Sequence, residues 1–354
     1  MKKIFFILSI LLTTLLLTSC NVEIGKEREG RRITIKQTVS VFDKLDGNGE
    51  ALYKKVIVEN DFLVNPKKVV TYNLGVADIF SYIGLEKLGI EKFGLPKGGN
   101  PLPESLREFD NKKYADTGTL FLLDKTVLDL FDADLIILDG RSAKHYEELK
   151  KDYPNADILD LSITTYSYET QKNNFAVLGQ IFEEAKDILD EKIKEYQTNF
   201  NEISLLAKDF RALFIQANGK GFSVGSGKKG RYGLFFNEFG FLEADPNGNK
   251  FDENSHGGNP SNTEYLKDVN PEVIFIMDRN QVVEGTGSDL SFLKDPLVKD
   301  VLAIKNENVY MLHAESWYTI TGGIKSTSQM ISDILAFISK VNWLDWQKVK
   351  ILLK

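Results

Sequence analysis

The feature that most constrains this chain is a long helical pattern near its middle, from Asn174 to Ala207. Apolar residues recur there three or four positions apart, with Glu and Lys between them and no proline. A helix of about thirty residues spans about 45 Å, which is more than one small domain needs. We therefore expect a single long helix joining two lobes, the alternative being a long surface helix within one domain.

Length and charge narrow the functional classes. The chain has 354 residues, 42% of them hydrophobic, and exceeds the usual size of a single domain. Its net charge of −7 falls to −9 without Lys2 and Lys3, the only charged residues before position 20. This balance argues against a nucleic-acid-binding surface. An anionic ligand would need a local cluster of cations.

The first twenty residues have the layout of a lipoprotein signal peptide. After Lys2 and Lys3, an apolar run from Ile4 to Leu17 is shorter than the roughly twenty residues of a membrane-spanning helix. Leu17-Thr18-Ser19-Cys20 resembles the bacterial lipobox, in which the cysteine is acylated. The alternative is an ordinary secretory peptide with an incidental cysteine. Because Cys20 is the only cysteine, disulfides and thiolate metal sites are excluded. We expect a protein tethered outside the cytoplasmic membrane.

The rest of the chain alternates between strand and helix patterns. A hairpin is predicted around Asp46-Gly47-Asn48-Gly49, and beyond Asn65-Pro66 the alternation indicates a parallel sheet covered on both faces. The fold class is therefore α/β, with two Rossmann-like lobes joined by a single long helix. The predicted units are a signal peptide (1–20), a tether and hairpin (21–57), an N-terminal lobe (58–166), the bridging helix (167–208), a C-terminal lobe (209–340) and a tail (341–354). We expect the tail to be a packing helix, the alternative being a basic helix facing the membrane.

One pattern occurs in both halves. In 132–141 and in 269–279, a buried strand follows a helix-and-turn segment and delivers an arginine, Arg141 or Arg279, just past its carboxyl end. Ligands of open α/β sheets bind beyond the carboxyl ends of the strands. Both arginines are therefore predicted to line a cleft between the lobes, although each taken alone is also compatible with a surface salt bridge.

A glycine-rich segment, Gly221–Gly233, matches two short motifs weakly. It fits the nucleophile-elbow pattern around Ser223 and a dinucleotide-binding pattern. Both patterns require a helix to begin within or directly after the motif, and no helical pattern begins there. We interpret it as a loop that presents Arg231, with Lys228 and Lys229 as supporting cations. A secreted hydrolase using Ser223 and His256 remains the alternative from another functional class.

Three more residues complete the predicted site. His256 lies in a polar, glycine-flanked loop, and Trp317 and Tyr318 are adjacent near the C-terminal end. With the three arginines, they give permanent cations around an imidazole and a phenol. Arginine binds anionic, electron-rich rings, and His nitrogen and Tyr oxygen are plausible ligands of ferric iron.

Over 33–338 the chain resembles the ferric-siderophore-binding lipoproteins of ABC importers, in the branch that binds catecholates such as petrobactin. The resemblance rests on the order and spacing of several segments: Asn65–Val70, Asp116–Phe121, Asp134–Arg141, Arg231–Gly233, His256-Gly257, Asn270–Arg279, Trp317-Tyr318 and Gly322-Gly323.

The resemblance implies a non-catalytic, monomeric receptor without a resident cofactor, bound to the membrane through its lipid anchor. It places Arg141, Arg231 and Arg279 against the catecholates, and His256 and Tyr318 on the iron when the siderophore supplies four oxygens. It also implies docking to a permease through an acidic residue on each lobe, with Glu238 as the candidate on the second. The alternatives are haem or a citrate-type chelate, whereas three scattered histidines argue against zinc.

Overall fold

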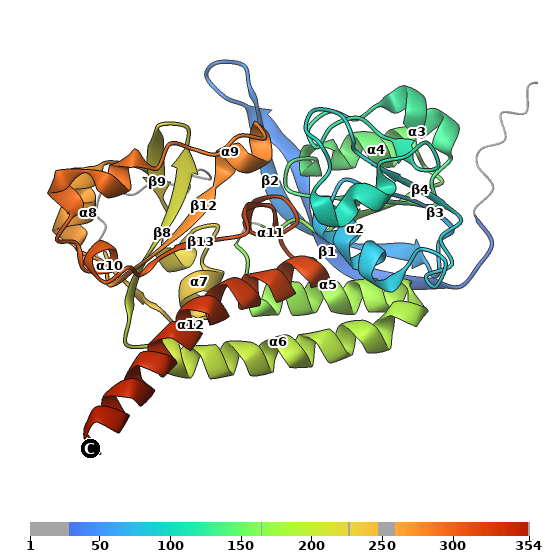
Figure 1. Cartoon of the computed structure of the whole chain (residues 1–354). Helices are drawn as coiled ribbons and strands as arrows, with labels where there is room; N and C mark the ends of the chain where they lie inside the picture. The colour runs from blue at the N-terminus through green and yellow to red at the C-terminus, as the bar shows by residue number, and fades with distance from the viewer. Residues whose placement is uncertain (1–27, 164, 226, 247–258, 353–354) are drawn as a thin grey trace, which may run out of the picture.

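The computed structural model describes residues 28–163, 165–225, 227–246 and 259–352, the side chains of 229, 259 and 341–352 excepted. Two α/β lobes lie side by side on a base of long helices (Figure 1). The base consists of α5 (Tyr168–Ile181), α6 (Lys186–Ala207) and α12 (Ile324–Leu352). No helix in these described ranges is both long and apolar enough to cross a membrane.

The N-terminal lobe contains the predicted parallel sheet. Its strands lie in the order β5 (Ala115–Asp116), β4 (Lys92–Leu95), β3 (Lys68–Thr71), β6 (Leu135–Leu138) and β7 (Asp157–Asp160). All four residues of β6 are buried, as expected for a strand covered on both faces. The flanking helices and turns are α2 (Leu74–Ile83), η1 (Glu104–Phe109), α3 (Lys125–Phe131), η2 (Ala143–His145) and α4 (Tyr146–Asp152).

The sheet of the C-terminal lobe is only partly parallel. Its order is β11 (Asn259–Ser261), β9 (Gly221–Val224), β8 (Arg211–Asn218), β12 (Val273–Asp278) and β13 (Val309–Met311), with β10 (Leu242–Glu243) also on β8. The expected parallel pairing holds from β8 to β13 but is wrong for β9, which runs antiparallel to β8. Only two residues separate these strands, a length that permits a hairpin but not a parallel crossover.

The remaining elements of this lobe are short. They surround the sheet and connect its strands: η4 (Gly227–Lys229), α7 (Leu234–Asn237), α8 (Thr263–Val269), α9 (Arg279–Val283), η5 (Ser291–Lys294), η6 (Pro296–Val298), α10 (Leu302–Lys305) and α11 (Ala314–Tyr318).

The prediction of one continuous helix over Asn174–Ala207 was wrong. The chain leaves α5 at Phe182, whose ψ of 94° is extended, passes through η3 (Glu183–Ala185) and returns as α6. Gly179 permits this reversal, because a Cβ there would lie 3.2 Å from the Cα of Lys186. The 22-residue α6 spans both lobes, but α12, with 29 residues, is the longest helix among the described residues.

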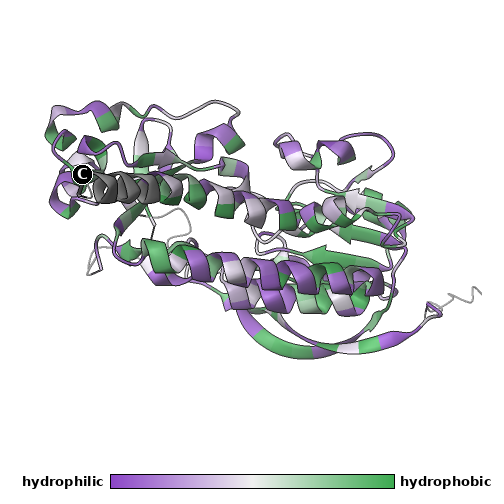
Figure 2. Ribbon diagram, turned by 60° about the horizontal axis from the view of Figure 1, so that its bottom comes forward, coloured by the Kyte–Doolittle hydropathy of each residue, from purple (hydrophilic) through white to green (hydrophobic). Residues whose placement is uncertain are grey.

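A continuous apolar core joins the lobes to the helical base. The rings of Phe80 and Phe182 meet edge to face at 5.1 Å, and Tyr196 of α6 donates a hydrogen bond to the carbonyl of Ile324 in α12 at 2.9 Å. Figure 2 shows hydrophilic and hydrophobic residues interleaved along these helices, as expected for elements with one buried side. Residues 341–352 continue α12, so the predicted tail is part of this longer helix.

The predicted hairpin consists of β1 (Arg32–Leu45) and β2 (Ala51–Leu63), with Gly49 donating its amide hydrogen to the Asp46 carbonyl at 3.1 Å. The predicted boundary at 57/58 therefore falls inside β2. In Figure 1 the hairpin runs along the N-terminal lobe and its turn projects beyond it. The hairpin contacts β7, so it belongs structurally to that lobe.

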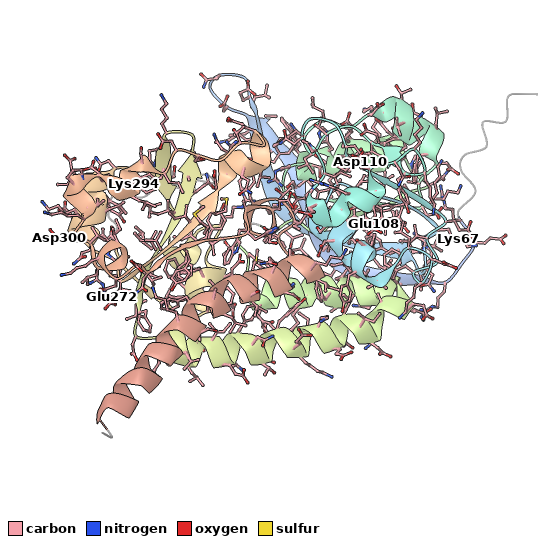
Figure 3. The ribbon with its side chains drawn as sticks, viewed as in Figure 1. Lys67, Glu108, Asp110, Glu272, Lys294 and Asp300 are labelled. Atoms are coloured by element: carbon pink, nitrogen blue, oxygen red, sulfur yellow. The ribbon has the colours of Figure 1, made fainter. Side chains whose placement is uncertain are left out.

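The repeated sequence pattern corresponds to a structural repeat. Asp132 and Asn270 end α3 and α8 in the left-handed conformation, with φ of 53° and 46°. Two residues later, Asp134 and Glu272 accept backbone N–H bonds at the start of the neighbouring strand. Figure 3 labels Lys67, beside Asp134, at the outer end of one lobe and Glu272 at the outer end of the other. The carboxyl ends of β6 and β12 therefore point towards the middle of the molecule.

Candidate functional site

A cavity of about 670 Å³ lies where the two lobes meet. The N-terminal lobe contributes Phe121, Asp139 and Arg141 to its wall, and the C-terminal lobe contributes Arg231 and Tyr318. This volume is typical of a small-molecule site. The cavity is therefore the candidate binding site. Arg141 lines it, as the sequence predicted, whereas Arg279 is not among the residues that line it.

Three arginines surround the ring of Tyr318. The guanidinium carbons of Arg231, Arg279 and Arg141 lie 4.6, 5.7 and 5.8 Å from its centroid. Arg141 follows β6 by three residues, and Arg279 begins α9 directly after β12. The structure thus brings together four residues that are spread over 178 positions of the sequence.

The phenol of Tyr318 is polarised by these cations. Arg279 donates from Nε to the phenol oxygen at 3.1 Å. Burial by itself would raise the pKa of Tyr318, but the hydrogen bond from Arg279 and the charges of Arg279, Arg231 and Arg141 outweigh it and lower that pKa below its ordinary value. The ring is therefore prepared to carry negative charge on its oxygen.

Arg231 is fixed by the backbone around it. Its Nη2 donates to the carbonyl of Tyr318 at 2.5 Å. The neighbouring Tyr232 stacks on Phe214 with centroids 4.1 Å apart and donates its hydroxyl hydrogen to Gln216 at 2.9 Å. Burial raises the pKa of Tyr232 to about 12, so this phenol stays neutral. Arg231 therefore lies in the turn between η4 and α7, in a loop as the sequence predicted, and the contacts of Tyr318 and Tyr232 hold it beside the cavity.

Trp317 and Lys228 lie less directly at the site. Trp317 lines the cavity but is 2% exposed, and its indole N–H donates to Asp333 at 2.8 Å. Its ring packs against Phe214, which makes it a core residue behind Tyr318. Lys228 is exposed in η4 and is not among the residues that line the cavity. Its carbonyl and amide hold the loop, through Asn237 and through Glu243.

Two other predicted residues fall outside the described ranges, and a third has a structural partner. His256 and Cys20 are not described, so their iron-binding and lipid-anchoring roles stay predictions. Glu238 is half-buried, and its carboxylate accepts the backbone N–H of Tyr168 at 2.9 Å, at the first turn of α5. It stabilises a helix start as well as being the candidate docking residue.

The arrangement around Ser223 does not fit a hydrolase. Ser223 lies within β9, paired with β8 and β11, and accepts a hydrogen bond from Asn218 at 3.3 Å. A nucleophile elbow requires a sharp turn from strand to helix at the serine, which an interior strand position cannot provide. The alternative interpretation of the glycine-rich segment is therefore wrong on this point.

Sequence reasoning missed the contribution of the hairpin. Ser40 of β1 and Lys55 of β2 line the cavity. Asp139, just after β6, also lines it and was not predicted either; its carboxylate lies 3.1 Å from Arg141. The alternating pattern of a hairpin does not indicate which of its faces lines a cavity. Within the described ranges, no cluster of three or more His, Cys, Asp or Glu side chains is placed to hold a metal ion.

The chain is similar to known proteins in both sequence and fold. The family model for "Periplasmic binding protein" matches residues 131–316. The chain is 31% identical over 337 residues to petrobactin-binding protein YclQ of Bacillus subtilis, covering 94% of this chain and 98% of that protein. It is 27% identical over 240 residues to ferric-anguibactin-binding protein FatB of Vibrio anguillarum, covering 66% and 73%. The crystal structure of YclQ superposes with a TM-score of 0.71 at 30% identity, over 85% of this chain and 99% of that one.

Proposed function

The chain belongs to the periplasmic binding protein family, and we propose that it is a receptor for a ferric catecholate-type siderophore. The family consists of extracytoplasmic substrate-binding proteins, which are not enzymes. The observation that carries the proposal is the cluster of three arginines around Tyr318. Arg141, Arg231 and Tyr318 line the cavity between the lobes, and Arg279 donates to the Tyr318 phenol without being among the lining residues. The comparison with YclQ, a petrobactin-binding protein, supports the same ligand class.

The chemistry of the cluster matches a ferric catecholate. Such a complex is anionic and presents flat, electron-rich rings. Arginine keeps its charge, donates several hydrogen bonds and stacks on aromatic faces. A guanidinium about 4 Å from a unit negative charge contributes on the order of 4 kcal/mol at an effective dielectric constant of about 20. A neutral hydroxamate complex would leave these charges uncompensated.

Iron is the cargo, and the protein would complete its coordination when the siderophore supplies only four oxygens. Tyr318 would then provide a phenolate oxygen, which the lowered pKa favours. His256 is the predicted second ligand, on the strength of the resemblance alone. With a six-oxygen siderophore, both side chains would remain off the metal.

Delivery and anchoring complete the proposal. We infer a lipid anchor at Cys20 and transfer of the ligand to an ABC permease, the usual route for extracytoplasmic receptors of this kind. Glu238 stays the candidate docking residue on the C-terminal lobe, although its contact with Tyr168 limits how far it can reach.

Direct binding tests the ligand class. The protein beginning after Cys20 would be titrated with a ferric catecholate, a ferric hydroxamate, ferric citrate and haem, and intrinsic fluorescence would be followed. We expect saturable quenching by the catecholate at concentrations where the hydroxamate has no effect. Binding of ferric citrate or haem without binding of the catecholate would contradict the proposal and identify a different iron chelate as the ligand.

A further inference from the structure

The hairpin of β1 and β2 adds a cation to the cavity that the arginine cluster does not account for. Ser40 and Lys55 face each other across the two strands, and both line the cavity. The side chain of Lys55 is 44% exposed. Part of the cavity wall therefore comes from a hairpin that precedes the main sheets of both lobes in the sequence.

The hairpin is held firmly on the edge of the N-terminal sheet. The side-chain amide of Gln37 donates to the carbonyl of Ile158 at 2.9 Å and accepts the N–H of Asp160 at 2.8 Å, as a neighbouring strand would. At the base of the hairpin, the carboxylate of Asp157 accepts the N–H of Leu63 at 2.7 Å. These contacts cover the edge of β7 and fix where Lys55 lies.

Lys55 lies near the carboxylate of Asp160, but its N–H donors are not used in hydrogen bonds to the described residues. Its Nζ lies 3.8 Å from Oδ2 of Asp160, whose side chain is fully buried. This separation is too long for a hydrogen bond, and Oδ2 makes none to any part of the chain that the structure describes. Lys55 likewise donates no side-chain hydrogen bond to the described residues. Its three N–H donors are therefore available to a ligand.

The position of Lys55 differs from that of the arginines. Asp160 pairs with Leu138 across β7 and β6, and Arg141 follows Leu138 by three residues. Neighbouring strands lie about 4.8 Å apart, and β7 is the edge strand of its sheet. Lys55 therefore lies beyond Arg141 on the side of the sheet edge, where it can reach a part of the ligand other than the group at Tyr318.

We propose that Lys55 binds a carboxylate that the ferric ligand carries outside its iron-binding groups. An ammonium group is a compact, strongly hydrated charge that suits a carboxylate oxygen, whereas the planar guanidinium groups suit the catechol rings. The inference rests on the proposed function and narrows it to catecholate chelates with an additional acidic arm. Because Lys55 is partly exposed, its contribution falls with increasing salt.

Paired synthetic ligands test this assignment. Ferric tetradentate catecholates would be prepared with an arm of several lengths that ends either in a carboxylate or in the matching carboxamide. At low salt, we expect the wild-type protein to prefer the carboxylate by about tenfold for at least one arm length. Lys55→Met should abolish the preference without changing the affinity for the carboxamide, and Lys55→Glu should reverse it.

The adjacent lysine supplies the control. Lys54 forms an ion pair with Asp43 at 3.1 Å and is 57% exposed, so Lys54→Met removes the same charge from the same hairpin. This variant should keep the wild-type preference. Equal preferences in the wild type and Lys55→Met at every arm length would overturn the assignment. Failure of the wild type to bind any of these ligands would instead overturn the proposed function, and the assignment with it.

Discussion

Arg279 donates a hydrogen bond from Nε to the phenol oxygen of Tyr318 at 3.1 Å, although 39 positions separate the two residues in the chain. The contact joins the start of α9 to the end of α11, two short helices that pack against each other at the cavity. It fixes the phenol oxygen, and it lowers the pKa of that group together with the charges of Arg231 and Arg141.

Replacing Arg279 should raise the pKa of Tyr318. Arg279→Met removes both the hydrogen bond and one positive charge, while the burial that opposes ionisation remains. The titration of Tyr318 is obtained as the difference in tyrosinate absorbance between a protein and its Tyr318→Phe counterpart. We expect this difference to appear at lower pH in the wild type than in Arg279→Met. The exposed Arg107→Met serves as the control, and titration at the same pH in all three proteins would contradict the account.

Loss of a cluster arginine should weaken binding of the ferric catecholate. Arg141→Ala and Arg279→Ala each remove a charge within 6 Å of the Tyr318 ring, and we expect affinity to fall by about tenfold or more. Isothermal titration with the ferric complex measures this. Arg31→Ala, at an exposed ion pair with Glu183, should leave the affinity unchanged. Unchanged affinity in both cluster variants would show that the ligand binds elsewhere.

Asp78 should make the protein less stable as the pH rises from about 4 through about 6. Burial raises its pKa in the folded state to about 6, although the backbone N–H groups of Ser326 and Lys325 partly offset the burial. Between the unfolded value of 3.8 and this value, the folded state binds more protons, so its free energy of unfolding falls with increasing pH.

Asp78→Asn should remove this dependence and raise the free energy of unfolding near neutral pH, by on the order of 1–3 kcal/mol. Urea unfolding at about pH 4.5 and about pH 7.5 measures the difference between the two conditions. The exposed Asp268→Asn is the matched control. A variant with the same pH dependence as the wild type would show that Asp78 is not the group responsible.

Ligand binding should move the lobes little relative to each other. One apolar cluster includes residues of both lobes, and Gly75 and Gly323 allow backbone contact between α2 and the segment before α12. A Cβ on Gly75 would lie 2.5 Å from the carbonyl oxygen of Thr321, so the two backbones are in direct contact there.

Spin labels can measure this motion directly. Cys20 is the only cysteine, so the body without it accepts Lys67→Cys and Lys294→Cys as the only labelling sites, one on each lobe (Figure 3). We expect the distance between the labels to change by less than about 3 Å on addition of ligand. A change of about 10 Å would indicate hinge closure instead.

The sequence predicts this site best where local patterns decide the structure. Arg141 and Arg279 follow continuous apolar strands, and strand ends in an α/β sheet have a known relation to ligands. The break at Phe182 was not predictable in this way, because the apolar spacing continues across it and no proline marks it. The reversal depends on the close approach of Gly179 and Lys186, a contact between two helices.

Lys55 illustrates the other limit. Because side chains alternate along a strand, the sequence predicts that Lys54 and Lys55 lie on opposite faces of the hairpin. It does not predict what either face contacts. The hydrogen bond between Gln37 and Asp160, which helps to place it, joins positions 123 apart. A local sequence pattern contains no information on long-range contacts of this kind. The sequence therefore predicts the hairpin but not that it lines the cavity.

The central claim is that the arginine cluster and Tyr318 receive a ferric catecholate with the phenol on the iron. The most direct test is a titration of the body after Cys20 with a ferric tetradentate catecholate, following its charge-transfer absorbance in the wild type and in Tyr318→Phe. The account predicts tight binding with a spectral shift in the wild type, and loss of that shift in the variant. An identical shift in both proteins would contradict coordination by Tyr318, and absence of binding to the wild type would contradict the receptor assignment itself.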